Sequence, residues 1–254
     1  LNIDYRTPKT LTDNHEEYEF LKELNADLAI VCAYGQIIPE NFLNLTKKGF
    51  VNIHASILPS WRGAAPIQRS IMNLDPETGI SIMKIKKELD SGPVSNIYKI
   101  KIDQNQNAQE ISEKLSALAA EKILDNVDDI LEDKAKFIDQ DHSKATYAKK
   151  IDKEESRIDW DEDASKIIGK INGLFPSPGA SFSFNGERYK ILKAEIGNGI
   201  GQVGEIISNQ LEVACNKNQS IKILEIQRQG KRPQKISEFM LGSQIKKGSK
   251  LSNV

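Results

Sequence analysis

The first half of the chain alternates between helical and strand-like spacing of its apolar residues. Apolar positions three or four apart predict helices, whereas short continuous apolar runs predict buried strands. The expected helices cover residues 14–25, a short turn opened by Pro39, residues 64–74 and residues 108–131. The expected strands cover residues 27–33, 50–54, 79–85 and 94–102. Strands that alternate with helices predict a Rossmann-like, mostly parallel α/β sheet, in which ligands bind beyond the carboxyl ends of the strands.

The pattern changes after a long polar and charged stretch. Beyond it lie short strand candidates that are interrupted by Gly, Asn and Pro, at residues 180–184, 189–194, 204–208, 211–215 and 221–227. Short strands at this spacing predict a small β-barrel. We therefore expect an α/β domain over residues 1–135, a linker over 136–163 and a second domain over 164–254.

Composition limits the class of protein. With 254 residues, of which 39% are hydrophobic, the chain is long enough for one or two domains with real cores. Cys32 and Cys215 lie far apart in apolar stretches, which predicts buried, reduced thiols and not a disulfide framework. Three histidines and two separated cysteines form no metal-ligand cluster, so we expect no metal. No run approaches the roughly 18 apolar residues of a membrane helix, so we expect no membrane role.

The charge of the chain is distributed unevenly. Residues 1–163 contain 21 basic and 30 acidic residues, a net charge of −9, whereas residues 164–254 contain 14 and 6, a net charge of +8. A basic second domain indicates a polyanionic partner such as a nucleic acid. A solvated basic face explains the charge equally well.

Asn52, His54 and Asp90 are the candidate catalytic residues. Asn52 and His54 are two positions apart in a predicted strand, so their side chains leave the same face. Asp90 lies in a turn with Gly92 and Pro93 that also follows a strand, so its carboxylate can converge on His54. A carboxylate beside an imidazole favours its charged form and fixes its orientation, while an Asn amide can donate to a developing oxyanion. This set predicts acyl transfer, although Asn-x-His alone more often only closes a strand.

The same region resembles the formyltransferases that use 10-formyltetrahydrofolate. Their shared signature is an Asn-x-His strand end, a Ser-Leu-Leu-Pro-like turn and a later Asp, and the turn stands here as Ser56-Ile57-Leu58-Pro59. The stretches at residues 33–39 (AYGQIIP), 61–68 (WRGAAPIQ) and 147–160 (YAKKIDKEESRIDW) are similar to the methionyl-tRNA formyltransferase branch in particular. The resemblance covers nearly the whole chain.

The resemblance implies a reaction and roles for individual residues. It implies transfer of a formyl group from 10-formyltetrahydrofolate, a co-substrate, to the amino group of initiator methionyl-tRNA for translation initiation. Asn52, His54 and Asp90 would be catalytic, and the folate site would be lined by Ser56, Ile57, Leu58 and Pro59. We expect a monomer in the bacterial cytoplasm, or in an organelle matrix.

The second domain would then be an OB-like barrel that helps to hold the tRNA. OB folds bind nucleic acids in many proteins. The candidate tRNA contacts are Arg62, beside the reactive turn, and Lys231 and Arg232 in a basic hairpin tip. Arg62 can instead brace its loop, and the hairpin tip can be a solvated turn.

The start of the chain differs from the family pattern. The family begins with a further strand-helix-strand portion, whereas this chain begins at Leu1 and its first residues resemble a connection from something upstream. We therefore expect a piece of a longer protein. A Rossmann-like sheet without its first strands would have exposed edges.

Three alternatives are open from the residues. Formyl transfer to a small amine, such as glycinamide ribonucleotide or an amino-sugar nucleotide, would use the same centre, although the basic second domain argues against it. The chain could be a tRNA-binding module whose α/β domain is inactive. The centre could also direct water to the formyl folate and hydrolyse it.

Overall fold

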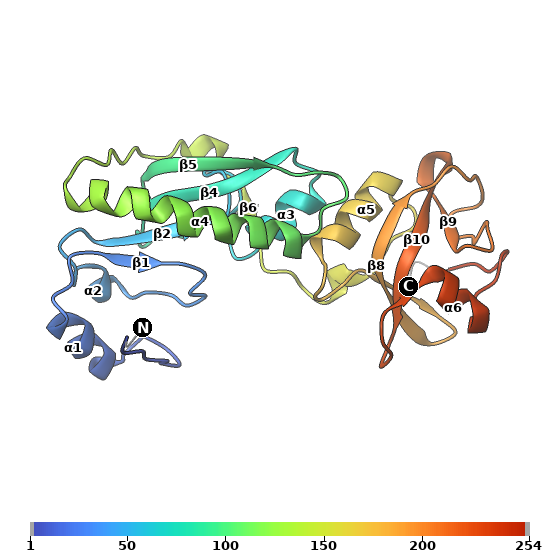
Figure 1. Ribbon diagram of the computed structural model, residues 1–254, viewed down its shortest axis with the longest axis horizontal. Helices are drawn as coiled ribbons and strands as arrows, with labels where there is room; N and C mark the ends of the chain where they lie inside the picture. Colours follow the sequence, from blue (N-terminus) through green and yellow to red (C-terminus); the bar gives the residue numbers. More distant parts are fainter. Residues whose placement is uncertain (1–2, 252–254) are drawn as a thin grey trace. The chain divides into compact units, whose positions relative to one another are not determined.

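The computed structural model describes residues 3–251 and divides them into two compact units (Figure 1). The first unit contains the residues up to Pro66 together with Gly79–Ile100 and Leu115–Lys149. The second contains Ile67–Thr78, Lys101–Lys114 and the residues from Lys150 onward.

A four-stranded sheet organises the first unit. Its strands are β1 (Ala29–Val31), β2 (Phe50–His54), β4 (Glu77–Lys84) and β5 (Val94–Lys101), in the order β1-β2-β4-β5. β1 is parallel to β2, whereas β4 is antiparallel to β2. The sheet is therefore mixed, and the prediction of a mostly parallel sheet was wrong.

The hydrophobic pattern does not contain the direction of a strand, which is why this difference was not foreseen. A buried apolar run predicts a strand whether it pairs parallel or antiparallel. The connection from β2 to β4 includes the helix α3 (Pro66–Met72), and a helix between two strands favoured the parallel interpretation.

Three helices of the first half form largely where the sequence predicts them: α1 (His15–Glu23), α2 (Glu40–Leu43) and the long helix α4 (Ala108–Leu131). The two-residue strands β3 (Arg62–Gly63) and β6 (Tyr147–Ala148) and the 3₁₀ turn η1 (His142–Lys144) were not predicted. α4 begins with a reciprocal cap, because Asn107 accepts from the Glu110 N–H at 3.0 Å and the Glu110 carboxylate accepts from the Asn107 N–H at 2.9 Å.

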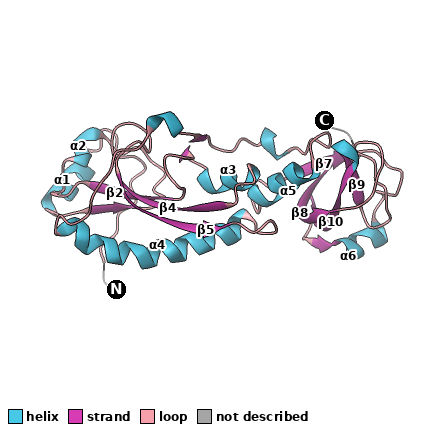
Figure 2. Ribbon diagram, turned by 90° about the horizontal axis from the view of Figure 1, so that it is seen from above, coloured by secondary structure: helices cyan, strands magenta, loops and turns pink. Residues whose placement is uncertain are grey.

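One core cluster joins α4 to the sheet. Ile130 of α4 packs with Val51 and Ile82 of the strands, and all three are at most 3% exposed. Figure 2 shows α4 running along one side of the sheet. β2 is thus a central, supported strand from which side chains can be held in fixed positions.

The second unit is built on an antiparallel sheet. Its strands are β7 (Ser181–Phe184), β8 (Glu187–Ile196), β9 (Glu212–Cys215), β10 (Gln219–Arg228) and β11 (Gln234–Lys235). The order is β11-β10-β8-β7, and β9 also pairs with β10. The unit further contains α5 (Ala164–Gly173), α6 (Ile236–Gly242) and the 3₁₀ turns η2 (Glu154–Ser156) and η3 (Asn216–Asn218). Its core surrounds Trp160, which is fully buried.

The predicted β-barrel is found only in part. Within residues 3–251 no pairing closes this sheet into a barrel. Residues 204–208 form no strand; Glu205 and Ile206 make single bridges to Lys250 and Val213. The predicted linker is not a free chain, because it includes the buried side chains of Gln140 and Trp160.

The edge strand β1 differs from its prediction. The apolar run around it predicted a buried strand, but Ile30 is 46% exposed and Cys32 is exposed, so the expected burial of Cys32 was wrong. The reason is that β1 lies at the edge of the sheet order. Cys215 is buried, as predicted. Among residues 3–251, no helix has the length and apolar character needed to cross a membrane.

Candidate active site

His54 ends β2 and is held on both sides of its ring. Its Nε2–H donates to the carbonyl oxygen of Trp61 at 2.9 Å, and its Nδ1 lies 3.6 Å from the Asp90 Oδ2. The side chain is only 6% exposed. A buried imidazole between a carbonyl and a carboxylate has a fixed orientation, which is what positioned proton transfer requires.

Asp90 reaches this imidazole from the loop between β4 and β5. Its Oδ2 also accepts a hydrogen bond from the Gly63 N–H at 2.8 Å. The backbone of Asp90 has a φ of 46°, in the left-handed region that is unfavourable for residues with a side chain. The structure thus brings His54 and Asp90 together, as the sequence predicts, and places Asp90 in a conformation that its surroundings must maintain.

Asn52 lies two residues before His54 on the same strand and is half-buried. Within residues 3–251 its side-chain amide makes no hydrogen bond. Its amide N–H, on the same strand face as His54, is therefore available to a ligand oxygen.

The expected folate turn is held by a hydrogen bond of its own and by two with Ser81 of β4. Ser56 is fully buried and its hydroxyl donates to the Ser60 carbonyl at 2.6 Å. Ser81 donates to the Ser56 carbonyl at 2.7 Å and accepts from the Leu58 N–H at 3.1 Å. The hydroxyl of Ser56 is therefore occupied and shapes the turn.

The other side chains of this turn divide by exposure. Leu58 is 4% exposed and belongs to the core, whereas Ile57 and Pro59 are half-buried. Of the four predicted folate residues, Ile57 and Pro59 thus have side-chain surface to offer a ligand.

Arg62 is buried, although charged residues are usually exposed. It is 2% exposed, and its Nε and Nη2 donate to the Gln140 Oε1 at 3.0 and 2.7 Å. Its Nη1 lies 3.4 Å from the His142 Nδ1. This position fits the alternative in which Arg62 braces its loop better than a surface contact with tRNA phosphate.

The comparisons with known proteins extend over the same chain. The family models "Formyl transferase" and "Formyl transferase, C-terminal domain" match residues 5–127 and 150–244. The methionyl-tRNA formyltransferase of Pelagibacter ubique is 66% identical over 253 residues, which are 100% of this chain and 82% of that protein. The chain belongs to the methionyl-tRNA formyltransferase family. The resemblance inferred from the motifs is therefore confirmed.

Solved structures support the same fold. The methionyl-tRNA formyltransferase from Clostridium thermocellum matches with a TM-score of 0.59 and 24% identity, over 73% of this chain and 80% of that one. HypX from Aquifex aeolicus, solved in complex with tetrahydrofolic acid, matches with a TM-score of 0.69 and 18% identity, over 92% of this chain and 41% of that one.

The sequence interpretation missed Gln140, which lies beside the candidate site around His54 and Asp90. It is 8% exposed and lies in the segment expected to be a linker. Besides accepting from Arg62, it donates through Nε2 to the carbonyls of Asp90 at 2.9 Å and Gly92 at 2.7 Å. A single amide flanked by charged residues carries no periodic signal, so only the three-dimensional fold identifies it.

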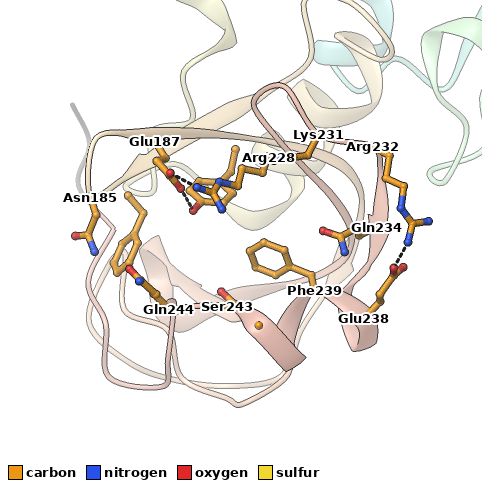
Figure 3. Close-up of a pocket in the computed structure, with 13 residues that line it drawn as sticks. Asn185, Glu187, Arg228, Lys231, Arg232, Gln234, Glu238, Phe239, Ser243 and Gln244 are labelled. Atoms are coloured by element: carbon orange, nitrogen blue, oxygen red, sulfur yellow. Dashed lines mark hydrogen bonds and ion pairs between the residues drawn. The ribbon is translucent and has the colours of Figure 1, made fainter.

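A second candidate site lies in the C-terminal unit of the chain. A half-open cavity of about 640 Å³ is lined by the β7–β8 hairpin, the end of β10, β11 and α6. Figure 3 shows the Phe239 ring near its centre, with the Arg228–Glu187 and Arg232–Glu238 ion pairs at its sides. Lys231 and Arg232, the predicted tRNA contacts, both line it.

The electrostatics of this cavity centre on Glu187. Its carboxylate accepts from the Tyr189 hydroxyl at 2.8 Å and pairs with Arg228. These hydrogen bonds, that of Tyr189 first, lower the pKa of Glu187. Burial, with the hydrogen bond to Glu187, raises the pKa of Tyr189 to about 12, so this hydroxyl stays a neutral donor at physiological pH.

A metal site is not evident. In the described part of the chain, residues 3–251, no group of three or more His, Cys, Asp or Glu side chains is placed to hold a metal ion.

Proposed function

We propose that this chain transfers a formyl group from 10-formyltetrahydrofolate to the amino group of initiator methionyl-tRNA. The observation that carries the proposal is the approach of Asp90 to His54, 3.6 Å apart, beside the unused amide of Asn52. The 66% identity to a methionyl-tRNA formyltransferase supports methionyl-tRNA as the acceptor.

The chemistry follows from these three side chains. The methionyl amine attacks the formyl carbon, and the formyl oxygen becomes an oxyanion that accepts a hydrogen bond from Asn52. Asp90 holds the His54 ring in position. The amine loses a proton, the folate nitrogen gains one through His54 or water, and the bond between that nitrogen and the formyl carbon breaks.

This route requires a rearrangement at His54. Both ring nitrogens now face protein groups, the Trp61 carbonyl and the Asp90 carboxylate. For His54 to act on substrate, its Nε2–H must exchange the Trp61 carbonyl for a substrate oxygen or a water molecule. Catalytic hydrogen bonds often tighten only in the complex with substrate.

The folate would lie along the turn at residues 56–59. Ile57 and Pro59 supply partly exposed apolar surface, while Ser56 and Leu58 hold the shape of the turn. Folate binding by HypX, which shares the fold, supports this co-substrate.

The tRNA would contact the second domain, for which we keep the boundaries 164–254 after a 136–163 linker. Its net charge of +8 and the exposed Lys231 and Arg232 support phosphate contacts. The antiparallel sheet around one core supports an OB-like relationship. We place the activity in a monomer in the bacterial cytoplasm.

The deciding experiment follows a labelled formyl group from 10-formyltetrahydrofolate. Full-length protein is offered methionyl-tRNA, glycinamide ribonucleotide, an amino-sugar nucleotide or water alone. Transfer to methionyl-tRNA only is expected. Transfer to a small amine, release of formate without acceptor, or tRNA binding without turnover would each replace the proposal by the corresponding alternative.

A further inference from the structure

One side of the C-terminal cavity, lined as described above, is aromatic. Phe239 and Tyr189 are 8% and 6% exposed, and their rings meet edge to face with centroids 5.8 Å apart. Both belong to the core cluster of the second unit, so the wall is rigid. The cavity volume of about 640 Å³ lies within the range of about 300–1,000 Å³ typical of small-ligand pockets.

Three amide side chains line the same cavity and are unused. Asn185, Gln234 and Gln244 make no side-chain hydrogen bond within residues 3–251, although all three line the space. Each amide offers both donors and an acceptor, which is the pattern that the edge of a nucleobase requires. Figure 3 shows Gln234 and Gln244 on different sides of the Phe239 ring.

The cations at the rim are available to different degrees. Arg228 and Arg232 already pair with Glu187 and Glu238. In the part of the chain that the structure describes, the Lys231 ammonium has no ion-pair partner, whereas its backbone is held: the N–H donates to the Arg228 carbonyl at 3.0 Å, and the carbonyl accepts from the Gln227 amide at 2.9 Å. A phosphate would therefore meet Lys231 first.

We infer that this cavity receives one nucleotide of the tRNA that lies outside a duplex. Its base would lie against Phe239 and the three amides, and its phosphate would contact Lys231 and Arg232. The inference rests on the proposed function for the identity of the RNA. Stacking on aromatic side chains together with cationic phosphate contacts is how proteins hold unpaired nucleotides.

The test measures binding of tRNA to full-length protein at several salt concentrations, without turnover. Lys231→Ala should weaken binding about 3- to 10-fold. The slope of log binding constant against log salt concentration should become shallower by about one, because about one counterion fewer is released. Gln234→Ala and Asn185→Ala should weaken binding about 2- to 5-fold without changing the salt dependence, because they contact the base. Lys193→Ala, an exposed β8 lysine that does not line the cavity, is the charge-matched control.

A photo-crosslinker at Gln244 identifies the ligand directly. Cross-links confined to one unpaired nucleotide are expected. Cross-links spread along a duplex, or equal effects of Lys193→Ala and Lys231→Ala, would overturn the inference. The formyl-transfer assay runs in parallel, so transfer to methionyl-tRNA with unaltered binding in all variants would reject the cavity and leave the proposed function standing.

A second inference comes from the hydrogen bonds of Gln140. Its amide is fully used: Oε1 accepts twice from Arg62, and Nε2 donates to the carbonyls of Asp90 and Gly92. Arg62 directly follows Trp61, whose carbonyl contacts His54 at 2.9 Å. Gln140 therefore ties together the two loops that face His54.

The structure assigns Gln140 as a positioning residue for the proposed reaction. It holds the carbonyl of Asp90, whose φ of 46° would relax without external support. Within residues 3–251 Gln140 makes no hydrogen bond to His54, so its effect passes through Asp90 and the segment of Trp61 and Arg62.

Gln140→Met, which keeps the length but not the hydrogen bonds, should lower kcat about 10- to 100-fold with little change in either KM, because misplacement by about 1 Å costs up to about 10²-fold. Gln140→Glu keeps the acceptor for Arg62 but directs oxygen at two carbonyls, so it should not restore the rate at neutral pH. Gln109→Met, on the exposed face of α4, is the matched control.

The split between kcat and KM separates positioning from mere stabilisation. In Gln140→Met, kcat per folded molecule should fall while both KM values stay near those of the wild type, because only the alignment at His54 changes. Unchanged kcat in a folded variant overturns the inference. A loss of activity that follows only the unfolded fraction also overturns it.

Discussion

The two candidate sites use polar side chains in opposite ways. At the first, Arg62 and Gln140 are 2% and 8% exposed and bond inward. At the second, the Arg232 side chain is 75% exposed and pairs at the rim. Buried hydrogen bonds are costly to break and fix geometry, whereas exposed ion pairs contribute little and exchange partners readily. Burial therefore suits a centre that aligns reacting atoms, and exposure suits a surface that adapts to a flexible anion.

Removing the reactive side chains should give the largest effect. His54→Ala or Asp90→Ala is expected to lower the formyl-transfer rate about 10²- to 10⁴-fold, because each removes positioned proton transfer. Single-turnover transfer with methionyl-tRNA measures it. His15→Ala, an exposed α1 histidine, is the control and should be unaffected. Unchanged rates in the two active-site variants would mean that His54 and Asp90 do not take part in formyl transfer.

Gly63→Ala should be the most damaging change to the support of that centre. A Cβ at Gly63 would lie 2.7 Å from the Ala148 carbonyl oxygen, and φ is 122°. We expect a loss of about 2–3 kcal/mol in the free energy of unfolding. Gly242→Ala, whose Cβ meets nothing within 4 Å, should stay within about 0.5 kcal/mol. Equal denaturant midpoints for both variants would contradict the close approach.

Glu212 tests whether the energetic weight of a polar side chain depends on its burial or on the unit in which it lies. It belongs to the second unit, like Arg232, but is buried. It is 8% exposed, and its Oε1 accepts from Ser220 at 2.7 Å, Gly199 at 2.8 Å and Asn198 at 3.1 Å. Burial alone would raise the pKa of Glu212, but these hydrogen bonds outweigh it and lower the pKa below the ordinary value of 4.5. Because the folded-state pKa is lower than the unfolded one, this stability is present above the unfolded pKa and is lost as pH falls through the folded pKa.

Glu212→Gln should therefore be less stable than the wild type by about 1–2 kcal/mol at pH 7. The difference should shrink as the pH falls below the ordinary value of 4.5. Urea unfolding at a series of pH values measures it. A difference that is constant with pH would show that the carboxylate charge does not contribute.

Breaking a rim pair should give the smallest effect on stability. Arg232→Gln is expected to change the free energy of unfolding by less than about 1 kcal/mol, because exposed pairs are screened. The same variant should reduce tRNA affinity measurably, which Glu238→Gln should not. A loss of stability comparable to that of Gly63→Ala would remove the contrast between the sites.

Some of this organisation could be predicted from the sequence. The β2 strand and its Asn52–His54 pair follow from a short apolar run and a period of two. The proximity of Asp90 to His54 could be predicted from its position after a strand and from the family signature. Cys215 was expected to be buried because it lies in an apolar run, and this is confirmed.

Other features were out of reach for physical reasons. Gln140 and Arg62 are polar, and polarity predicts exposure, so nothing local indicates that they satisfy one another inside the fold. The hydrophobic pattern indicates that β4 is a strand but not that it runs antiparallel to β2. Residues 204–208 were expected to form a strand but make only single bridges, Glu205 to Lys250 and Ile206 to Val213. Whether an apolar segment finds a long pairing partner cannot be inferred from its own periodicity.

The contrast between Cys32 and Cys215 provides a native reporter of local opening. Cys32 is exposed and will react with a thiol reagent at once. Burial raises the pKa of Cys215 to about 12, so near neutral pH it lacks both the thiolate and the access that reaction requires. Cys215 will be labelled only when β9 separates from β10. The slow phase of labelling in the unmodified protein therefore times the opening of its second unit, without any engineered probe.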